Sequence, residues 1–257
     1  MLYLRILIFL FIIAATVIAS ITYKKYRDTP NRYFLYLLLL TLGTECIGYL
    51  YLYFYFFPQT TFTLFFKGIL PEVISKQNYW VFNIFRIITF YLYLYYFLKL
   101  LKKLKHRRYI YAILLIYTVF VVADLILKSE GFFSKNLMWV RISGTLSILL
   151  ATTFYFNEIF DSDKILNIYK ELSFWLIIGS LFYYLVTVPI IIFTKLFYNF
   201  QGIYVSILLL SNIVLYGCFI IGFVVNARKS VLERKHFYVP SGGDSVIKEK
   251  TERKLIF

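Results

Sequence analysis

The chain of 257 residues is 61% hydrophobic and 22% aromatic, and only 16% of its residues are charged. An ordinary soluble domain is less apolar and more highly charged, so this composition indicates an integral membrane protein. The formal net charge of +15 is high enough to suggest nucleic acid, but the distribution of the basic residues among the loops explains it without such a partner.

Seven runs of roughly 20 apolar residues, the length that crosses a bilayer core of about 30 Å as a helix, follow one another along the chain. They cover about 2-23, 33-57, 80-99, 109-127, 137-156, 172-194 and 203-226. We therefore predict an all-α fold, a polytopic bundle of seven transmembrane helices in 1-226, with a flexible basic tail in 227-257. This tail is too short for a folded output domain, and we expect it to bind anionic lipid headgroups or to fold on a partner.

Basic residues alternate in number between successive connections. The connections 24-32, 99-108 and 157-171, together with the chain after 226, contain 20 of the 28 Lys and Arg residues, whereas the opposing set contains six. The positive-inside rule then predicts an outside N-terminus and a cytoplasmic C-terminus. The predicted location is the bacterial inner membrane.

Two segments of the first half need an interpretation of their own. Residues 1-20 resemble a signal peptide, but four Lys and Arg residues follow within 24-32. A secretory signal would export those charges, so we interpret the run as a retained first helix. The connection 58-79 contains Pro58, Gly68 and Pro71 and is predicted to form short broken helices along the interface, or a lid over an outward-facing pocket.

Ionisable side chains within spans are rare, cost a few kcal/mol each near the bilayer centre, and must face the bundle interior. Four residues of this kind are Glu45, Arg86, Asp124 and Arg141. The predicted topology places all four at mid-depth or in the outer half. Two acids and two bases at compatible depths suggest ion pairs of Glu45 with Arg86 and of Asp124 with Arg141.

Two interpretations of this group stay open. In the functional one, an outward cavity binds a small polar or anionic ligand with Arg86 as its anchor, and Asn83 and Asn212 add polar groups to Glu45, Asp124 and Arg141. In the structural one, the pairs hold the second to fifth helices in register. Asp124 and Arg141 then extend to the outer interface.

Pro189 in the sixth run should kink or break that helix, and it is a candidate hinge. The cytoplasmic connection 157-171 contains four acidic residues and two lysines. Glu158, Asp161 and Asp163 are candidates for docking a cytoplasmic partner. The simpler interpretation is that this connection pairs with the basic run 99-108.

Catalytic chemistry is not predicted. The two histidines, His106 and His236, lie in basic cytoplasmic segments, and the sequence contains none of the hydrolase, phosphate-loop or zinc-protease motifs. Cys46 and Cys218 lie inside apolar runs, where a thiol behaves as a small hydrophobe. We expect neither an enzyme nor a cofactor or metal.

The segments "NYWVFNIFRIITFYLYLYYF" (78-97), "RISGTL" (141-146), "ELSFWLIIGSLFYYLVTVP" (171-189) and "NIVLYGCFIIGF" (212-223) resemble a family of uncharacterised bacterial seven-helix membrane proteins. Some of these neighbour or precede histidine kinases. The resemblance implies a sensory or signalling membrane module, and it names no ligand.

The function predicted from the sequence is an integral membrane sensor with an outward-facing polar pocket that relays to a cytoplasmic partner. The first alternative is a small-solute transporter or permease subunit. The second is a structural subunit of a membrane complex.

Overall fold

The structure, a computed structural model, describes residues 2–69, 78–127, 132–133, 135–161, 163–193 and 201–237. These ranges form helices and connections without a strand, which confirms the predicted all-α fold. The helices are α1 (Leu2–Thr22), η1 (Tyr23–Lys25), α2 (Arg32–Phe56), α3 (Thr61–Ile69), α5 (Tyr79–Leu100), α6 (Leu104–Leu127), α7 (Met138–Phe160), η3 (Asp163–Lys170), α8 (Leu172–Phe193) and α9 (Gln201–Phe237).

Six helices in the described ranges are long and apolar enough to cross a membrane, which indicates a membrane protein. They are α1, α2, α5, α6, α8 and α9. Helix α7 has 23 residues and occupies the fifth predicted span, but its Ser and Thr residues and Arg141 lower its mean hydropathy. A helix therefore occupies each of the seven predicted ranges. Six of these helices are long and apolar enough to cross a membrane.

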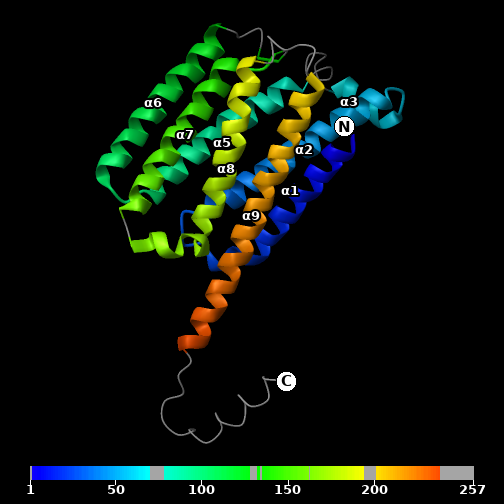
Figure 1. The fold of residues 1–257 in the computed structure, drawn as a ribbon. Helices are drawn as coiled ribbons and strands as arrows, with labels where there is room; N and C mark the ends of the chain where they lie inside the picture. The colour runs from blue at the N-terminus through cyan, green and yellow to red at the C-terminus, as the bar shows by residue number, and fades with distance from the viewer. Residues whose placement is uncertain are drawn as a thin grey trace, which may run out of the picture.

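The long helices pack in a ring. Helix α1 contacts α2 and α9, α2 contacts α5, α5 contacts α7, α7 contacts α8, and α8 contacts α9. Helix α6 lies outside this ring, at one side of the bundle, against α5 and α7 (Figure 1). Side chains on the inner faces of six helices thus point toward a shared interior.

Helices α8 and α9 approach closely because glycines remove the side chains between them. A Cβ atom added to Gly179 would lie 2.7 Å from the Cβ of Cys218, and one added to Gly222 would lie 2.8 Å from the Cβ of Trp175. Side chains at these two positions would clash, so the glycines let the two backbones approach closely, as small residues do at helix interfaces in membranes. Helix α8 continues through Pro189 to Phe193, so the proline, whose side chain is exposed, does not break it.

Aromatic side chains fill the end of the ring near η1 and η3. Phe34, Tyr96 and Phe219 are each at most 1% exposed. The centroid of the Phe34 ring lies 4.8 Å from that of Tyr96 and 5.3 Å from that of Phe219. The Oδ1 atom of Asn31 accepts hydrogen bonds from the hydroxyls of Tyr96 (3.1 Å) and Ser173 (3.0 Å). One amide therefore joins the start of α2 to α5 and α8, and this end of the bundle is closed.

Two connections differ in detail from the predictions. Helix α9 runs to Phe237 rather than ending near 226, so the first part of the predicted flexible tail is helical. Residues 238–257 lie outside the described residues. In the connection 58-79, the expected short helix is present as α3, and it lies near the N-terminus (Figure 1).

Candidate functional site

Two adjoining cavities lie between the helices. The first, which we call the vestibule, has a volume of about 510 Å³ and lies between α1, α2, α5 and α9. The second, the inner cavity, has a volume of about 250 Å³ and is lined by α2, α5, α7, α8 and α9. Both are lined by Glu45, Phe82, Asn212 and Tyr216, which we call the neck.

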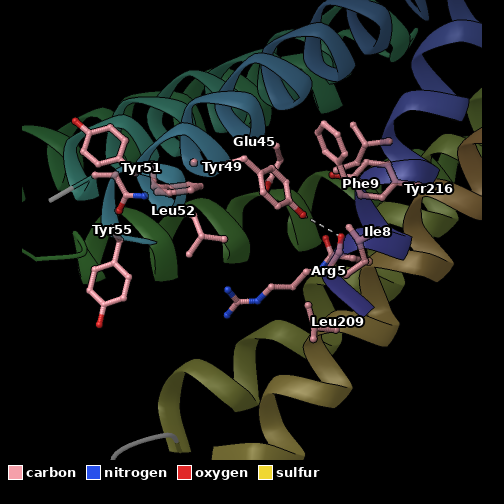
Figure 2. Close-up of a pocket in the computed structure, with 15 residues that line it drawn as sticks. Arg5, Ile8, Phe9, Glu45, Tyr49, Tyr51, Leu52, Tyr55, Leu209 and Tyr216 are labelled. Carbon is pink, nitrogen blue, oxygen red and sulfur yellow. Dashed lines mark hydrogen bonds between the residues drawn. The ribbon is translucent and has the colours of Figure 1, made fainter. Parts of the chain in front are cut away.

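The vestibule reaches the surface near the start of α1. Arg5 and Tyr55 line it and are exposed, whereas Ile8 and Ile12 are buried along its wall. The hydroxyl of Tyr49 donates a hydrogen bond to the carbonyl oxygen of Arg5 at 3.2 Å, which ties α2 to α1 (Figure 2). The Arg5 guanidinium points toward the side where Leu52 and Tyr55 lie (Figure 2).

The inner cavity is polar because helical spacing places its polar residues on inward faces. Thr41 and Glu45 are four apart on α2, Arg86 and Thr89 are three apart on α5, and Arg141 and Thr145 are four apart on α7. Residues at these intervals lie one above the other on the same helix face. Three faces of the ring therefore direct charged and hydroxyl groups into one space.

Arg86 is held in place by two amides. Its Nη1 atom donates to Oδ1 of Asn136 at 2.7 Å and to Oδ1 of Asn83 at 3.4 Å. A guanidinium has five N–H donors, and among the described residues the hydrogen bonds of Arg86 use one nitrogen only. The remaining donors are available to a molecule in the inner cavity.

Arg141 lines the inner cavity together with Arg86. It indicates a bound anion more strongly than Arg86 does. Within the described ranges its guanidinium forms neither a hydrogen bond nor an ion pair, and the two guanidiniums repel each other. Thr89, which also lines this cavity, is 7% exposed, and its hydroxyl has no hydrogen-bond partner among the described residues. Cations away from bulk water need an anion nearby.

Glu45 supplies the one acidic side chain among the described residues that line the two cavities. It is partly buried at the neck, and among described residues it forms no hydrogen bond or ion pair. Arg5 attracts it across the vestibule. The predicted pairs of Glu45 with Arg86 and of Asp124 with Arg141 are therefore wrong for the part of the chain that the structure describes.

Asn83 lines neither cavity and has a structural position. Its side chain is 0% exposed. Its amide nitrogen donates to the carbonyl oxygens of Phe132 and Lys135, both at 2.9 Å, and its Oδ1 accepts the backbone N–H of Leu137 at 3.2 Å. Asn83 fixes the connection before α7 and so positions Asn136 against Arg86.

Asp124 also has a structural position. It is buried on α6, outside the ring, and Oδ2 accepts the backbone N–H groups of Trp139 (3.0 Å) and Val140 (3.2 Å). These groups open α7, so Asp124 acts as an N-terminal cap supplied by a neighbouring helix, where a carboxylate also complements the helix dipole. Of the six candidates, the cavities are lined by Glu45, Arg86, Arg141 and Asn212.

Sequence reasoning missed Arg5 and Asn136. Arg5 lies in the first predicted span and was not named as a candidate, although its spacing from Ile8, Phe9 and Ile12 places all four on one helix face. Asn136 lies in a connection between spans, where no periodicity identifies a contact. Its role depends on how Asn83 folds that connection back onto α5.

The acidic residues at the opposite end of the bundle pair mostly within the chain. The carboxylate of Glu158 accepts the backbone N–H groups of Lys102 (2.8 Å) and Lys103 (2.9 Å) and lies 3.0 Å from Nδ1 of His106. Asp161 pairs with Lys103, and this contact lowers the pKa of the Asp161 carboxyl. Glu158 is thus engaged by the basic run, while the side chain of Asp163 lies outside the described residues.

Within the described residues, no three or more His, Cys, Asp and Glu side chains gather where they would hold a metal ion. Comparisons of the chain with models of protein families, with curated proteins and with solved structures found no match.

Proposed function

We propose that this protein is an integral membrane sensor that binds a small ligand with an anionic group in the inner cavity and signals through α9. In this proposal the seven helices α1, α2, α5, α6, α7, α8 and α9 all cross the membrane. The vestibule faces outside, and the extension of α9 lies in the cytoplasm. Ligand binding changes how α9 packs against α1 and α8.

The course of α9 is the observation that carries the proposal. Leu208, Asn212 and Tyr216 of this helix line the cavities, and the same helix continues to Phe237 without interruption. Its 37 residues correspond to about 55 Å at 1.5 Å per residue, well beyond a bilayer core of about 30 Å. Figure 1 shows α9 leaving the bundle at the end opposite α3. A tilt at the cavity therefore moves the projecting end.

The charge distribution supports this orientation. Lys102 and Lys103 in the connection between α5 and α6, and Lys105 in the first turn of α6, lie at the end of the bundle where α9 projects. There Lys25 also donates to the carbonyl oxygen of Ala227 at 2.8 Å. Basic residues concentrate on the cytoplasmic side of membrane proteins. Helix α7 fits a seventh span because its Arg141 and Thr145 line the inner cavity and its Ser143, Ser147 and Thr152 are buried within the bundle.

The closed end of the ring favours a sensor over a transporter. Passage of a solute beyond the inner cavity would require the buried rings of Phe34, Tyr96 and Phe219 to separate. A signal along α9 requires no such opening, since the helix itself connects the cavity to the other side.

Double electron–electron resonance on the full chain in nanodiscs tests the relay. In a background with Cys46→Ser and Cys218→Ser, spin labels at Lys105→Cys and Arg228→Cys report the position of the α9 extension relative to α6. Labels at Lys105→Cys and Lys24→Cys form the reference pair. Small carboxylates, phosphates, amino acids and sugars are first screened for thermal stabilisation that Arg141→Gln removes.

We expect such a ligand to shift the 105–228 distance distribution and to leave the 24–105 distribution in place. Proteoliposomes containing the protein alone should not accumulate the same ligand. A ligand that leaves the 105–228 distances unchanged and crosses the liposome membrane would instead establish a transporter. Failure of every solute class to stabilise the protein would refute binding in the cavity.

A further inference from the structure

We infer that the ligand is a zwitterion of the α-amino acid class, with its carboxylate at Arg86 and Arg141 and its ammonium group at Glu45. This inference rests on the proposed function for its use of the inner cavity as a binding site. It goes further because it assigns a separate role to each charged wall of that cavity. It also assigns the vestibule to the rest of the ligand.

The inner cavity contains opposite charges that do not neutralise each other. Arg86 and Arg141 lie on α5 and α7, Glu45 lies on α2, and all three line the same space. Between described residues no ion pair joins either guanidinium to Glu45. Opposite charges that are close in a medium of low dielectric attract strongly. Their separation therefore leaves room for a molecule between them.

A ligand with a single negative charge satisfies half of this arrangement. A carboxylate between Arg86 and Arg141 relieves their mutual repulsion, and Thr89 adds a hydroxyl that has no hydrogen-bond partner in the described part of the chain. Glu45, however, would then face an additional negative charge. An ammonium group next to the ligand carboxylate gives Glu45 a partner at short range.

Arg5 does not already provide that partner. It attracts Glu45 but forms no ion pair with it among the described residues, and its side chain is exposed at the vestibule. The guanidinium points toward Leu52 and Tyr55 (Figure 2). Screening by solvent weakens such a distant attraction. A ligand ammonium group inside the neck would therefore interact with Glu45 more strongly than Arg5 does.

The vestibule provides space for an amino acid side chain. Ile8, Phe9, Ile12 and Leu52 give it an apolar wall next to the neck. The vestibule, with about 510 Å³, lies in the size range of small-molecule sites, which runs from about 300 to 1,000 Å³, and the adjoining inner cavity, with about 250 Å³, lies just below it. We therefore expect apolar or aromatic amino acids, such as leucine and phenylalanine, to bind more tightly than glycine.

Binding measurements on the full chain in nanodiscs test the assignment of charges. The probes are L-leucine, isocaproate and isoamylamine, with L-phenylalanine, hydrocinnamate and phenethylamine as a second set. Each set compares the amino acid with the same molecule lacking its amine or its carboxylate. We expect either amino acid to bind about 10- to 100-fold more tightly than its two partial analogues, as loss of a charge-assisted hydrogen bond predicts.

Two variants separate the charged walls. Glu45→Gln should bring the affinities for the amino acid and its deaminated acid to within about threefold of each other. Arg141→Gln should weaken both by about tenfold or more. Asp28→Asn, a change of one exposed acidic group far from the cavities, is the control and should leave all affinities unchanged.

Equal binding of the amino acid and its deaminated acid by the unaltered protein would overturn the inference, and that comparison does not depend on any variant folding. Retention of the amine preference in folded Glu45→Gln protein would overturn it as well. If a simple carboxylate binds and moves the 105–228 spin labels, the sensor proposal stands while the zwitterion fails. If the amino acid binds through Glu45 and the labels do not move, the zwitterion assignment stands while the sensor proposal fails.

Discussion

Replacement of Asn83 by alanine should destabilise the bundle although this residue does not line a cavity. The side chain is fully buried and makes four hydrogen bonds, to Phe132, Lys135, Leu137 and Arg86. Three of them lie between 2.9 and 3.2 Å, and the fourth, from Arg86, is longer at 3.4 Å. Loss of Asn83 also leaves two carbonyl oxygens and one N–H group without this partner.

The expected cost follows from the number of bonds. A side-chain hydrogen bond in a membrane protein contributes about 0.6 kcal/mol on average and up to about 1.7 kcal/mol. Three strong bonds and one weak bond, with the cost of unpaired buried groups, give a loss of about 2–4 kcal/mol. Asn212→Ala is the matched control, because the amide of Asn212 donates only to Leu208 of its own helix among the described residues.

Reversible unfolding in mixed detergent and SDS micelles, followed by tryptophan fluorescence, measures these differences. Asn83→Ala should also weaken ligand binding, because Asn136 loses the support that places it against Arg86. Asn212→Ala should lose less than about 1 kcal/mol. An Asn83→Ala protein within about 0.5 kcal/mol of the unaltered chain would refute the structural assignment of Asn83.

Three further predictions concern packing, capping and pH. Gly144→Ala places a Cβ against the ring of Phe90, closer than side-chain atoms can approach, and Phe90 is 3% exposed, so unfolding free energy should fall by about 1–3 kcal/mol. In Gly217→Ala the new Cβ meets no atom of another described segment within 4 Å, and the change should be neutral or slightly stabilising; equal losses in both variants would contradict the packing argument. Asp124→Ala should lower the unfolding free energy by about 1–2 kcal/mol and leave ligand affinity unchanged, whereas an unchanged stability with lost affinity would place Asp124 in the site. Because Lys103 lowers the pKa of Asp161, their pair stabilises the fold above the unfolded pKa of about 3.9, and this contribution disappears as pH falls through the lower folded value. The stability difference between the unaltered chain and Asp161→Asn should therefore shrink as pH falls below about 4 and vanish once the pH is below the lowered folded pKa, and a difference that grows with acidity would contradict this sign.

The positions of the long helices follow from the sequence because backbone groups in an apolar medium must be satisfied within the segment. Long apolar runs therefore become helices wherever they occur, and the predicted ranges agree with α1, α2 and α5 to within a few residues. The end of α9 could not be predicted in the same way. Hydropathy marks where an apolar run stops near 226, whereas the helix continues to Phe237 in a basic segment that can still form backbone hydrogen bonds.

The roles of the ionisable residues depended on the tertiary structure. Glu45, Arg86, Asp124 and Arg141 look equivalent along the chain, since each is a charge within an apolar run. Helix α6 packs outside the ring, so Asp124 meets the first N–H groups of α7 and not the cavity. The other three lie on helices of the ring and face its interior. Sequence alone thus determined which residues must avoid lipid, and helix packing decided whether each finds a backbone partner or faces a space where a ligand fits.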